Sequence, residues 1–547
     1  MKKLMILLIF VLVVLGLHAT EYEWAWIKQA GGTSYDLGRA IAVDAAGNSY
    51  VSGVFSDTVE FGTTTLSSNG GYDIFVAKLD PNGNWLWAQQ VGDTNYDEGY
   101  AISVDAAGNS YVSGYFMGTA TFGTTILTGY GDSDIFIAKL DADGNWLWAK
   151  QAGGTSSDMG WAIAVDATGS SYVSGDFYGT ATFGMTTITS SGGSNIFVAK
   201  LDPNGNWLWV VCPNGEYSGV SSAIAVDTAG NSYISGFFDG TAIFGTNTST
   251  SNGYDDIFVA KLDPNGDWLW AKQAGGSGHD EGYAVVVDAN GNSYISGGFS
   301  DAAMFGTTTL TSNGSNDIFV AKLDPNGNWL WAKRAGGTSY DESYAIAVDA
   351  AGNSYLSGLF SASATFGTYS LTSDGDYDIF VAKLDPNGNW LWAKQAGGTL
   401  TDGSLAIAID TGGNCYISGA LSDTATFGTS IFTSNGEFDI FVAKLSPDGI
   451  FVDDELISPA ASVSHLGNAY PNPFRAGSTG TIKADVPARE TGVFTIYNLR
   501  GQVIQSHHLS AGAHELSVAT TDLAPGIYFY RLQTPSFCEV KKLLVLK

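Results

Sequence analysis

A seven-residue segment, Asp73–Leu79, returns six more times in the 547-residue chain, each time 61 residues further on and with little change. The copies begin at residues 134, 195, 256, 317, 378 and 439, so no insertion or deletion interrupts the spacing. A period of this length, kept seven times, predicts a chain built from copies of one supersecondary unit. Residues that recur in every copy are explained first by the repeat, so a functional site is sought where the copies differ.

Each copy is expected to form four short antiparallel strands. In the second copy, residues 101–105, 110–116, 134–140 and 146–151 alternate with the two-residue period of β-strands. The Asp-x-x-Gly-Asn segments between them suit hairpin turns, because Asp caps the turn and Gly accepts a positive φ. The 70 glycines and only 14% charged residues agree with many short strands and tight turns. Seven such sheets around an axis make an all-β, seven-bladed propeller with 61-residue blades.

The repeat begins out of phase, and this predicts how the ring closes. Residues 24–30 match a fourth strand that has no blade before it, while the last copy has Phe451-Val-Asp453 where the others have Trp-x-Trp. Pairing the N-terminal strand with the last blade would remove two open sheet edges. The Trp-x-Trp pairs hold 14 of the 15 tryptophans, and with the phenylalanines of the Phe-Gly pairs they are expected to pack between blades.

The N-terminus and the charge indicate an exported protein. Lys2 and Lys3 precede an apolar run over residues 4–17, which is short for a membrane span and typical of a cleavable signal peptide, residues 1–19. No other apolar stretch approaches membrane-spanning length. The net charge of −30 belongs to the repeats, because residues 467–547 hold eight Lys and Arg against five Asp and Glu. So acidic a surface argues against nucleic acid and anionic lipid as partners.

Two runs in the repeats carry a family resemblance. They are Ala-Lys-Leu-Asp-Pro-Asn-Gly-Asn-Trp-Leu-Trp at residues 77–87 and Ala-Ile-Ser-Val-Asp-Ala-Ala-Gly-Asn-Ser-Tyr-Val-Ser-Gly at residues 101–114. They resemble the bacterial β-propeller repeats known as SBBP repeats. The resemblance covers residues 23 to about 450 and implies an exported protein of a family without a shared activity. We expect the propeller to occupy residues 20–450.

The rest of the chain predicts a linker and a second domain. Residues 451–466 are rich in Ser, Pro and Ala, as linkers are, and residues 467–547 have short strands between Gly and Pro turns, which predict a small β-sandwich. The motifs at residues 468–474, 496–502, 523–530 and 541–547, in this order, resemble a type IX secretion sorting domain (type A). The resemblance implies type IX secretion machinery as a partner and a bacterial protein that is either released or attached to the outer surface. The matching residues are Tyr470, Pro471, Asn472, Pro473, Phe474, Gly501, Gly526, Tyr528, Lys541 and Lys542.

No catalytic constellation, metal site or cofactor is predicted. Of six histidines only His279 lies in the repeats, and the sequence pairs no nucleophile with it, so we interpret it as a loop residue. Cys212, Cys415 and Cys538 are isolated and predict neither a disulfide framework nor a zinc site. One set of aspartates just before the first strand either caps backbone amides, as is routine in turns, or rings the channel mouth with negative charge. This set is Asp36, Asp97, Asp158, Asp280, Asp341 and Asp402.

Two positions vary where the copies otherwise agree. The residue before the first strand is Arg39, Tyr100, Trp161, Ser222, Tyr283, Tyr344 or Leu405, and the residue after the glycine of the second strand is Val54, Tyr115, Asp176, Phe237, Gly298, Leu359 or Ala420. In a meander both positions lie at the end of the ring with the long loops, near the channel mouth. Such side chains either contact sugars or peptide groups or pack between blades. The candidate ligand-binding residues are Arg39, Tyr100, Trp161, Tyr283, Tyr344, Tyr115, Asp176 and Phe237.

Three functions remain open on this basis. The first is a non-enzymatic exported propeller that binds a glycan or a protein partner through its loop-rich face. The second is a surface or matrix scaffold without a defined pocket. The third is a carboxylate-based glycosidase or lyase, which would need an acid pair roughly 5–10 Å apart at the channel mouth. A binder predicts exposed aromatic residues at the rim, and a scaffold predicts buried ones.

Overall fold

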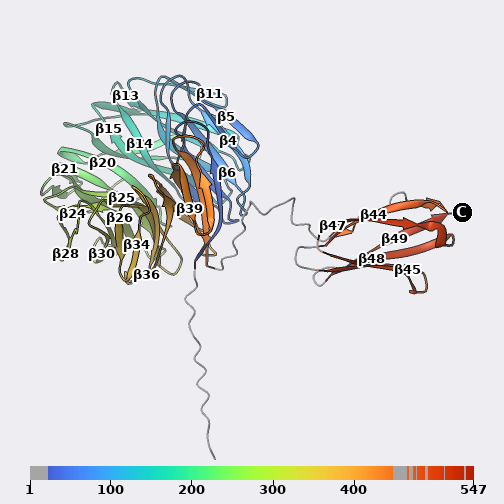
Figure 1. Ribbon diagram of the computed structural model, residues 1–547. Helices are drawn as coiled ribbons and strands as arrows, with labels where there is room; N and C mark the ends of the chain where they lie inside the picture. Colours follow the sequence, from blue (N-terminus) through green and yellow to red (C-terminus); the bar gives the residue numbers. More distant parts are fainter. Residues whose placement is uncertain are drawn as a thin grey trace, which may run out of the picture. The chain divides into compact units, whose positions relative to one another are not determined.

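The computed structural model describes residues 22–447, 465–466, 472–475, 477–486, 491–510, 512–534 and 538–546 (Figure 1). The predicted signal peptide and most of the predicted linker lie outside these residues. The chain divides into two compact units, Met1–Val452 and Asp453–Lys547. Strands dominate the described residues, in which the one helix is the 3₁₀ turn η2, Thr520–Asp522. The predicted all-β propeller class is confirmed.

The first unit repeats one four-stranded antiparallel sheet. In the first copy β2 (Leu37–Val43) pairs with β3 (Ser49–Phe55), β3 with β6 (Asp73–Leu79), and β6 with β7 (Trp85–Val91). The two middle strands are buried along their whole length, and the two flanking strands are partly buried. The first, or inner, strands of the other copies are β8 (Glu98–Val104), β14 (Asp158–Val165), β20 (Asn214–Val226), β25 (Asp280–Val287), β31 (Asp341–Val348) and β37 (Gly403–Ile409).

The remaining strands keep the same order in each copy. The second strands are β9 (Ser110–Phe116), β15 (Ser171–Phe177), β21 (Ser232–Phe244), β26 (Ser293–Phe299), β32 (Ser354–Phe360) and β38 (Cys415–Leu421). The third strands are β12 (Asp134–Leu140), β18 (Asn195–Leu201), β23 (Asp256–Leu262), β29 (Asp317–Leu323), β35 (Asp378–Leu384) and β41 (Asp439–Ser446). The fourth, or outer, strands are β13 (Trp146–Gly154), β19 (Trp207–Val211), β24 (Trp268–Gly276), β30 (Trp329–Gly337), β36 (Trp390–Gly398) and, in the last sheet, β1 (Glu23–Ala30).

The inner strands contact one another in a closed cycle. Each of them contacts the inner strand of the next copy, and β2 of the first copy contacts β37 of the last. Figure 1 shows the copies following one another around the unit in the order of the sequence colours. From this cycle we infer one blade per copy and seven blades in the ring.

The N-terminal strand completes the last sheet, as the phase of the repeat predicts. β1 pairs with β41 in antiparallel register, with Ile27 opposite Ala443. Trp24 and Trp26 are 2% and 5% exposed, and the Trp26 Nε1 donates to the carbonyl of Pro81 at 3.1 Å. The strand is therefore bound to the last sheet by backbone pairing and to the first copy by the Trp26 side chain. This pairing removes two open sheet edges.

The paired tryptophans pack between copies. The first of each pair meets the phenylalanine of a Phe-Gly pair edge to face, as Trp85 does with Phe61 at 5.0 Å between ring centroids. The second reaches the next copy, as Trp87 does when its Nε1 donates to the carbonyl of Ala142 at 3.2 Å. The predicted packing role of these residues is confirmed.

Each copy also contains a hairpin that the sequence analysis did not predict. It lies in the Gly/Thr stretch between the second and third strands, where four-residue strands are too short to show a clear period. In four copies it pairs with the outer strand of the preceding copy, as Phe183 does with Ala152, and so widens that sheet. The hairpin strands are β4 (Thr58–Phe61), β5 (Thr64–Ser67), β10 (Thr119–Phe122), β11 (Thr125–Thr128), β16 (Thr180–Phe183), β17 (Thr186–Thr189), β22 (Asn247–Thr250, paired with the end of β21), β27 (Ala302–Phe305), β28 (Thr308–Thr311), β33 (Ser363–Phe366), β34 (Tyr369–Thr372), β39 (Thr424–Phe427) and β40 (Ser430–Thr433).

The tight turns at one end of the ring have the predicted caps. In the turn after β25, the Asp288 Oδ1 accepts from the backbone N–H groups of Asn290 and Asn292, each at 2.9 Å. Gly291 of this turn has φ +79°, a conformation that a Cβ atom disfavours. The same arrangement recurs in the other copies, which explains why these residues are repeated.

The aspartates before the inner strands are caps as well. Asp36 is fully buried, and its two carboxylate oxygens accept from the backbone N–H of Gly32 at 2.8 Å and of Ser56 at 3.3 Å. Asp97 accepts from Asp93 and Met117 in the same way. The capping interpretation is therefore confirmed, and the alternative, a ring of negative charge at the mouth, is wrong for these buried side chains.

The second unit has two sheets around one core. Its three-stranded sheet has the order β42 (His465–Leu466), β44 (Thr479–Val486), β47 (Gly512–Ala519). Its five-stranded sheet has the order β43 (Phe474–Arg475), β49 (Cys538–Leu546), β48 (Gly526–Gln533), β45 (Gly492–Asn498), β46 (Val503–Leu509). Buried residues of both sheets form one apolar cluster, with Ile482 from the first and Phe494 from the second. We interpret this unit as the predicted small β-sandwich.

Candidate functional site

The first set of varying residues lies at an irregularity in each inner strand. Between Gly38 and Ala40 the register of β2 against β3 shifts, and Arg39 is the extra residue. The same shift recurs in the other six inner strands, at Tyr100, Trp161, Ser222, Tyr283, Tyr344 and Leu405. Because a bulge re-aims the side chain of its extra residue, each copy presents one variable side chain at the loop-bearing end.

Three of these residues, from consecutive copies, form a stacked row. The Arg39 Cζ lies 4.9 Å from the centroid of the Tyr100 ring. Tyr100 stacks on Trp161 with 4.2 Å between centroids and 27° between the ring planes. Tyr115, from the second varying position, lies against Tyr100 at 5.7 Å. The predicted candidates therefore contact one another across three copies.

Acidic side chains bind several polar atoms of this row. The Arg39 Nη2 donates to the Glu98 Oε2 at 2.7 Å, and the Tyr115 hydroxyl donates to the other oxygen of Glu98 at 3.2 Å. The Trp161 Nε1 donates to the Asp176 Oδ1 at 2.5 Å. Burial raises the pKa of Asp176, while its hydrogen bonds from Ser194 and Trp161 oppose that rise. The Arg39 Nε is buried without a hydrogen-bond partner among the described residues, so these contacts leave one polar atom of the row unpaired.

The eight candidate side chains are neither exposed, as expected for a binder, nor all fully buried, as expected for a scaffold. Tyr115 and Asp176 are buried, and the other six are half-buried: Arg39, Tyr100, Trp161, Tyr283, Tyr344 and Phe237. Phe237 lies at the corresponding end of β21. The rim is thus not a ring of exposed aromatic residues, and the most open part of this end lies elsewhere.

Tyr283 and Tyr344 meet in a second cluster, beside two glutamates. Their ring centroids lie 5.4 Å apart. The Tyr283 hydroxyl donates to Glu281 and lies 3.3 Å from the Glu342 Oε1, so the two carboxylates are at most about 6 Å apart, the length of two hydrogen bonds. Burial raises the pKa of both glutamates.

These glutamates were missed by the sequence analysis. Glu98, Glu281 and Glu342 occupy one position of the repeat, two residues before the bulge, where other copies have Leu37 and Met159. A change from an apolar residue to a carboxylate at a strand end is a signal that a comparison of the copies contains.

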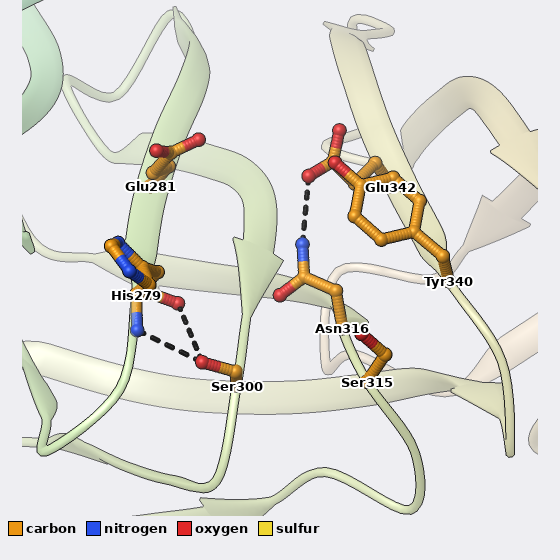
Figure 2. A pocket seen from close by; sticks show the side chains of 7 residues that line it. All are labelled: His279, Glu281, Ser300, Ser315, Asn316, Tyr340 and Glu342. Carbon is orange, nitrogen blue, oxygen red and sulfur yellow. Dashed lines mark hydrogen bonds between the residues drawn. The ribbon is translucent and has the colours of Figure 1, made fainter.

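A cavity of about 280 Å³ opens between the copies that contain these two glutamates. Figure 2 shows Glu281 and His279 on one side of it and Glu342, Tyr340 and Asn316 on the other. Ser300 and Ser315 complete its lining. The Asn316 Nδ2 donates to the Glu342 Oε1 at 2.7 Å, and Glu342 itself is 2% exposed. Carboxylate, amide, hydroxyl and imidazole groups thus face one small space that an aromatic ring also lines.

His279 lies in the loop before β25, as predicted, but it is not isolated. Its Nδ1 lies 3.2 Å from the Asp255 Oδ2, and its side chain is 59% exposed. The ligand atoms of Asp255, His279 and Glu281 all lie within 4.8 Å of one another. The chain therefore brings together a histidine and two carboxylates that are 24 and 2 residues away from it in the sequence.

In the C-terminal unit, the described residues of the sorting motif lie in or beside its strands. Phe474 is fully buried and pairs in parallel with Val545. The Asn472 side chain binds the backbone of the last strand, donating to the Lys542 carbonyl at 3.0 Å and accepting from the Leu544 N–H at 3.1 Å. Pro473, Gly501, Gly526, Tyr528 and Lys541 are also described, and Tyr470 and Pro471 lie outside the described residues.

Two families match parts of the chain. The family described as Beta-propeller repeat (SBBP) matches residues 25–54 and 86–115, and the family described as Secretion system C-terminal sorting domain matches residues 468–546. The chain contains SBBP repeats and a type IX sorting domain. Both predicted resemblances are confirmed. The sorting domain points to secretion and to attachment at the outer surface of a bacterium, and it implies an interaction with the type IX secretion machinery. No helix in the described part of the chain is long and apolar enough to cross a membrane.

Relatives of the SBBP repeats are distant. An uncharacterised WD repeat-containing protein of Acanthamoeba polyphaga mimivirus is 24% identical over 465 residues, which are 66% of this chain and 33% of that protein. The regulatory protein FlaEY of Caulobacter vibrioides is 28% identical over 191 residues, 33% of this chain and 20% of that protein. The chain thus spans a third or less of the length of these relatives.

Solved structures resemble the chain only weakly. A fungal alcohol oxidase of the AA5 family in complex with copper has a TM-score of 0.40 and 13% identity, over 96% of this chain and 99% of that chain. An apocarotenoid oxygenase of Synechocystis has a TM-score of 0.33 and 10% identity, over 90% and 96%. Likeness at this level carries no argument about activity.

Proposed function

We propose that this secreted propeller is non-enzymatic and binds a glycan in the cavity at its loop-bearing end. The observation that carries the proposal is the lining of that cavity, where Tyr340, Asn316 and Glu342 face His279 and Glu281. A volume of about 280 Å³ suits a group of the size of one or two sugar rings, near the lower end of ordinary ligand pockets at about 300–1,000 Å³.

The chemistry of the lining supports a polyhydroxylated ligand. Each sugar hydroxyl both donates and accepts, and here carboxylates accept, the Asn316 amide does both, and the hydroxyls of Ser300 and Ser315 do either. The half-buried Tyr340 ring supplies an apolar wall for the C–H face of a sugar. A protein partner would instead need a contact surface of roughly 800 Å² on this chain, far larger than the cavity.

One observation favours a second candidate, a carboxylate-based glycosidase. Glu281 and Glu342 both contact the Tyr283 hydroxyl, so their separation of at most about 6 Å is compatible with the pair that retaining glycosidases use, at about 5–5.5 Å. Burial raises the pKa of both carboxyl groups, which is the direction that a general acid requires. The two candidates share one site and differ in whether the bound glycan is cleaved.

A glycan array with the purified full-length chain tests both. We expect binding to a restricted set of glycans and a loss of at least about tenfold in affinity for Tyr340→Ala, a change of about 1.4 kcal/mol. Tyr96→Ala is the matched control, because Tyr96 occupies the same position of the repeat in another copy and is 53% exposed. Trp161→Ala tests the stacked row in the same assay.

The outcomes separate the hypotheses. Binding that Tyr340→Ala loses and Tyr96→Ala keeps supports the cavity. Equal binding by both variants, or no glycan bound by a folded protein, contradicts the glycan proposal. Shortened glycans after incubation, absent with Glu342→Gln, would favour the glycosidase.

A further inference from the structure

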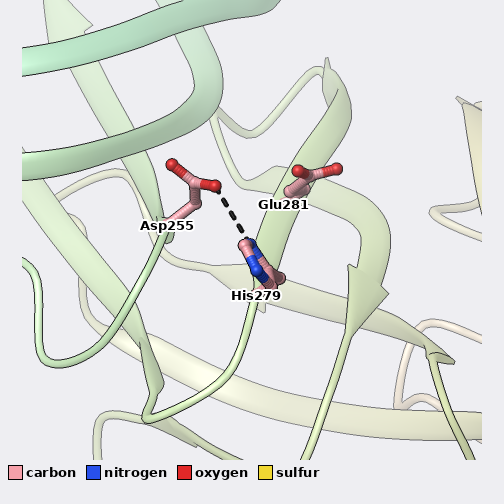
Figure 3. Close-up of side chains that lie close together, drawn as sticks. All are labelled: Asp255, His279 and Glu281. Atoms are coloured by element: carbon pink, nitrogen blue, oxygen red, sulfur yellow. Dashed lines mark hydrogen bonds and ion pairs between the residues drawn. The ribbon is translucent and has the colours of Figure 1, made fainter.

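Asp255, His279 and Glu281 form a cluster that neither the repeats nor the proposed glycan binding explains. Asp255 directly precedes β23, and His279 and Glu281 flank the first residue of β25. Figure 3 shows the three side chains converging from these two segments. The Asp255 Oδ2 lies 3.2 Å from the His279 Nδ1, and all three ligand atoms lie within 4.8 Å of one another.

The repeat does not require these residues. At the position of Asp255 the other copies have Tyr72, Ser133, Ser194, Asn316, Tyr377 and Phe438, and at the position of His279 they have Tyr35, Tyr96, Ser157, Ser218, Tyr340 and Thr401. The aspartate occurs in one copy of seven, before β23, and the histidine occurs only in the copy that follows it, before β25. Their meeting is therefore not part of the blade architecture, in contrast to the turn caps.

The surroundings hold the cluster in place. The His279 ring stacks on Tyr254 with 4.6 Å between centroids and 12° between planes. The His279 backbone N–H donates to the Ser300 Oγ at 2.9 Å, and the Ser300 backbone N–H donates to the His279 carbonyl at 3.0 Å. Glu281 accepts from the Tyr283 hydroxyl. Contacts of this kind, which orient the residues that hold an ion, recur around protein metal sites.

The ligand atoms are of the types and at the spacing that a small divalent cation needs. Zinc is bound by His nitrogen at about 2.0–2.1 Å and by carboxylate oxygen at about 2.0–2.2 Å, so neighbouring ligand atoms lie roughly 3–3.5 Å apart. The 3.2 Å between the Asp255 Oδ2 and the His279 Nδ1 fits this value, and the ligand atom of Glu281 lies within 4.8 Å of both. Two carboxylates and a neutral imidazole also carry the charge that a divalent ion balances.

We propose that Asp255, His279 and Glu281 bind one divalent transition-metal ion, with Zn²⁺ as the reference ion. Three protein ligands leave coordination positions open. Because His279 and Glu281 also line the cavity, a hydroxyl group bound there has access to the ion. The site stands on its own residues and does not depend on whether the ligand of the cavity is a glycan.

Zinc titration of the full-length chain, freed of metal with a chelator, tests the proposal by calorimetry. We expect one equivalent of Zn²⁺ at the site, and visible absorption bands when Co²⁺ replaces it. Asp255→Asn and His279→Tyr are expected to weaken this binding at least tenfold and to remove the Co²⁺ bands. Both substitutions install the residues that the next copy has, Asn316 and Tyr340, so the variants are expected to fold like the native chain.

The C-terminal unit supplies the control. His508 is an exposed histidine of that unit, and His508→Ala is expected to leave the high-affinity equivalent unchanged. A folded native chain that binds no Zn²⁺ at millimolar concentration would overturn the proposal. So would binding of equal affinity by the native chain, Asp255→Asn and His279→Tyr. Because metal alone is the probe, neither result bears on the glycan experiment.

Discussion

The two ends of the propeller differ in how far their residues vary from copy to copy. At the turn end every copy has the same aspartate, glycine and tyrosine, and six of the seven have the same asparagine, with Ser170 in the third copy. At the loop end the bulge carries a side chain that varies between copies: Tyr in three copies and Arg, Trp, Ser or Leu in the other four. The difference shows that repeated residues report on the scaffold, and that a site has to be sought where the copies diverge.

At the turn end a recurring set of contacts links neighbouring copies. Tyr111 is fully buried, and its hydroxyl lies 3.2 Å from each of two acceptors, the Asp105 Oδ2 and the carbonyl of Gly169 in the next copy. The Lys139 ammonium lies 4.6 Å from the centroid of its ring. One side chain thus ties a turn, a strand and the neighbouring copy together.

The loop end divides into three parts with different partners. The row of Arg39, Tyr100 and Trp161 is stacked, and Glu98 and Asp176 accept hydrogen bonds from its two ends. The cavity beside Tyr340 leaves polar groups open to a ligand, and the cluster around His279 offers ligand atoms to an ion. The divergence of the copies therefore serves structure in one sector and, as we propose, binding in another.

The largest effect on the free energy of unfolding is expected from replacing a tyrosine that links two copies at the turn end. Tyr111→Ala should lower the free energy of unfolding by about 3–5 kcal/mol, because it removes a large buried ring and the bonds that this ring makes. Urea denaturation followed by tryptophan fluorescence measures it. Tyr96→Ala, at the loop end and 53% exposed, should change stability by less than about 0.5 kcal/mol. Similar losses of stability for the two variants would contradict the difference between the two ends.

The buried aspartate caps before the inner strands test the difference between the two ends further, because they are repeated residues that lie at the loop end. Burial raises the pKa of Asp158 to about 7, against the effect of its hydrogen bonds from Gly154 and Tyr178. Between about pH 4 and 7 the folded protein keeps a proton that the unfolded chain has lost. The contribution of Asp158 to the free energy of unfolding is therefore fully present below the pKa that this group has in the unfolded chain. It is lost as the pH rises through 7.

This predicts a native chain that is more stable at pH 5 than at pH 8. Asp158→Asn should make the decline shallower, by up to about 1.4 kcal/mol per pH unit, the maximum for one group. The control is Asp141→Asn at the turn end, where the hydrogen bond from Asn145 lowers the pKa of Asp141, so it does not titrate in this range. Denaturation curves at several pH values give both slopes, and equal slopes for the two variants would contradict the assignment.

A smaller effect is expected from the glycine of a single turn. Gly291→Ala should cost about 1 kcal/mol, because φ +79° strains any residue with a Cβ atom while the nearest neighbouring atom leaves room at 3.5 Å. Gly291→Asn should cost less, since Asn tolerates this conformation better. Thermal unfolding of both variants measures the difference, and metal and glycan binding are expected to stay unchanged. A loss of binding would show that the two ends are coupled.

Residues that act within one copy were predictable from the sequence. The strands, the Asp-capped turns, the packing of Trp85 and Trp87, and the closure by residues 24–30 all follow from local periodicity and from the phase of the repeat. The extra hairpins were missed because strands of four residues show too little alternation. Glu342 was missed because a carboxylate at a strand end resembles an ordinary surface residue until its burial is known.

By itself the sequence determined the repeated unit, its period, the closing strand and the sorting domain, because each rests on patterns within a few tens of residues. The tertiary structure alone decided which of the varying side chains meet. Asp255 and His279 belong to neighbouring blades and touch only because a loop of one blade lies beside a loop of the next. Glu281 and Glu342 likewise share one hydroxyl only because two blades pack side by side. Contacts of this kind depend on the position of whole sheets, which no local pattern encodes.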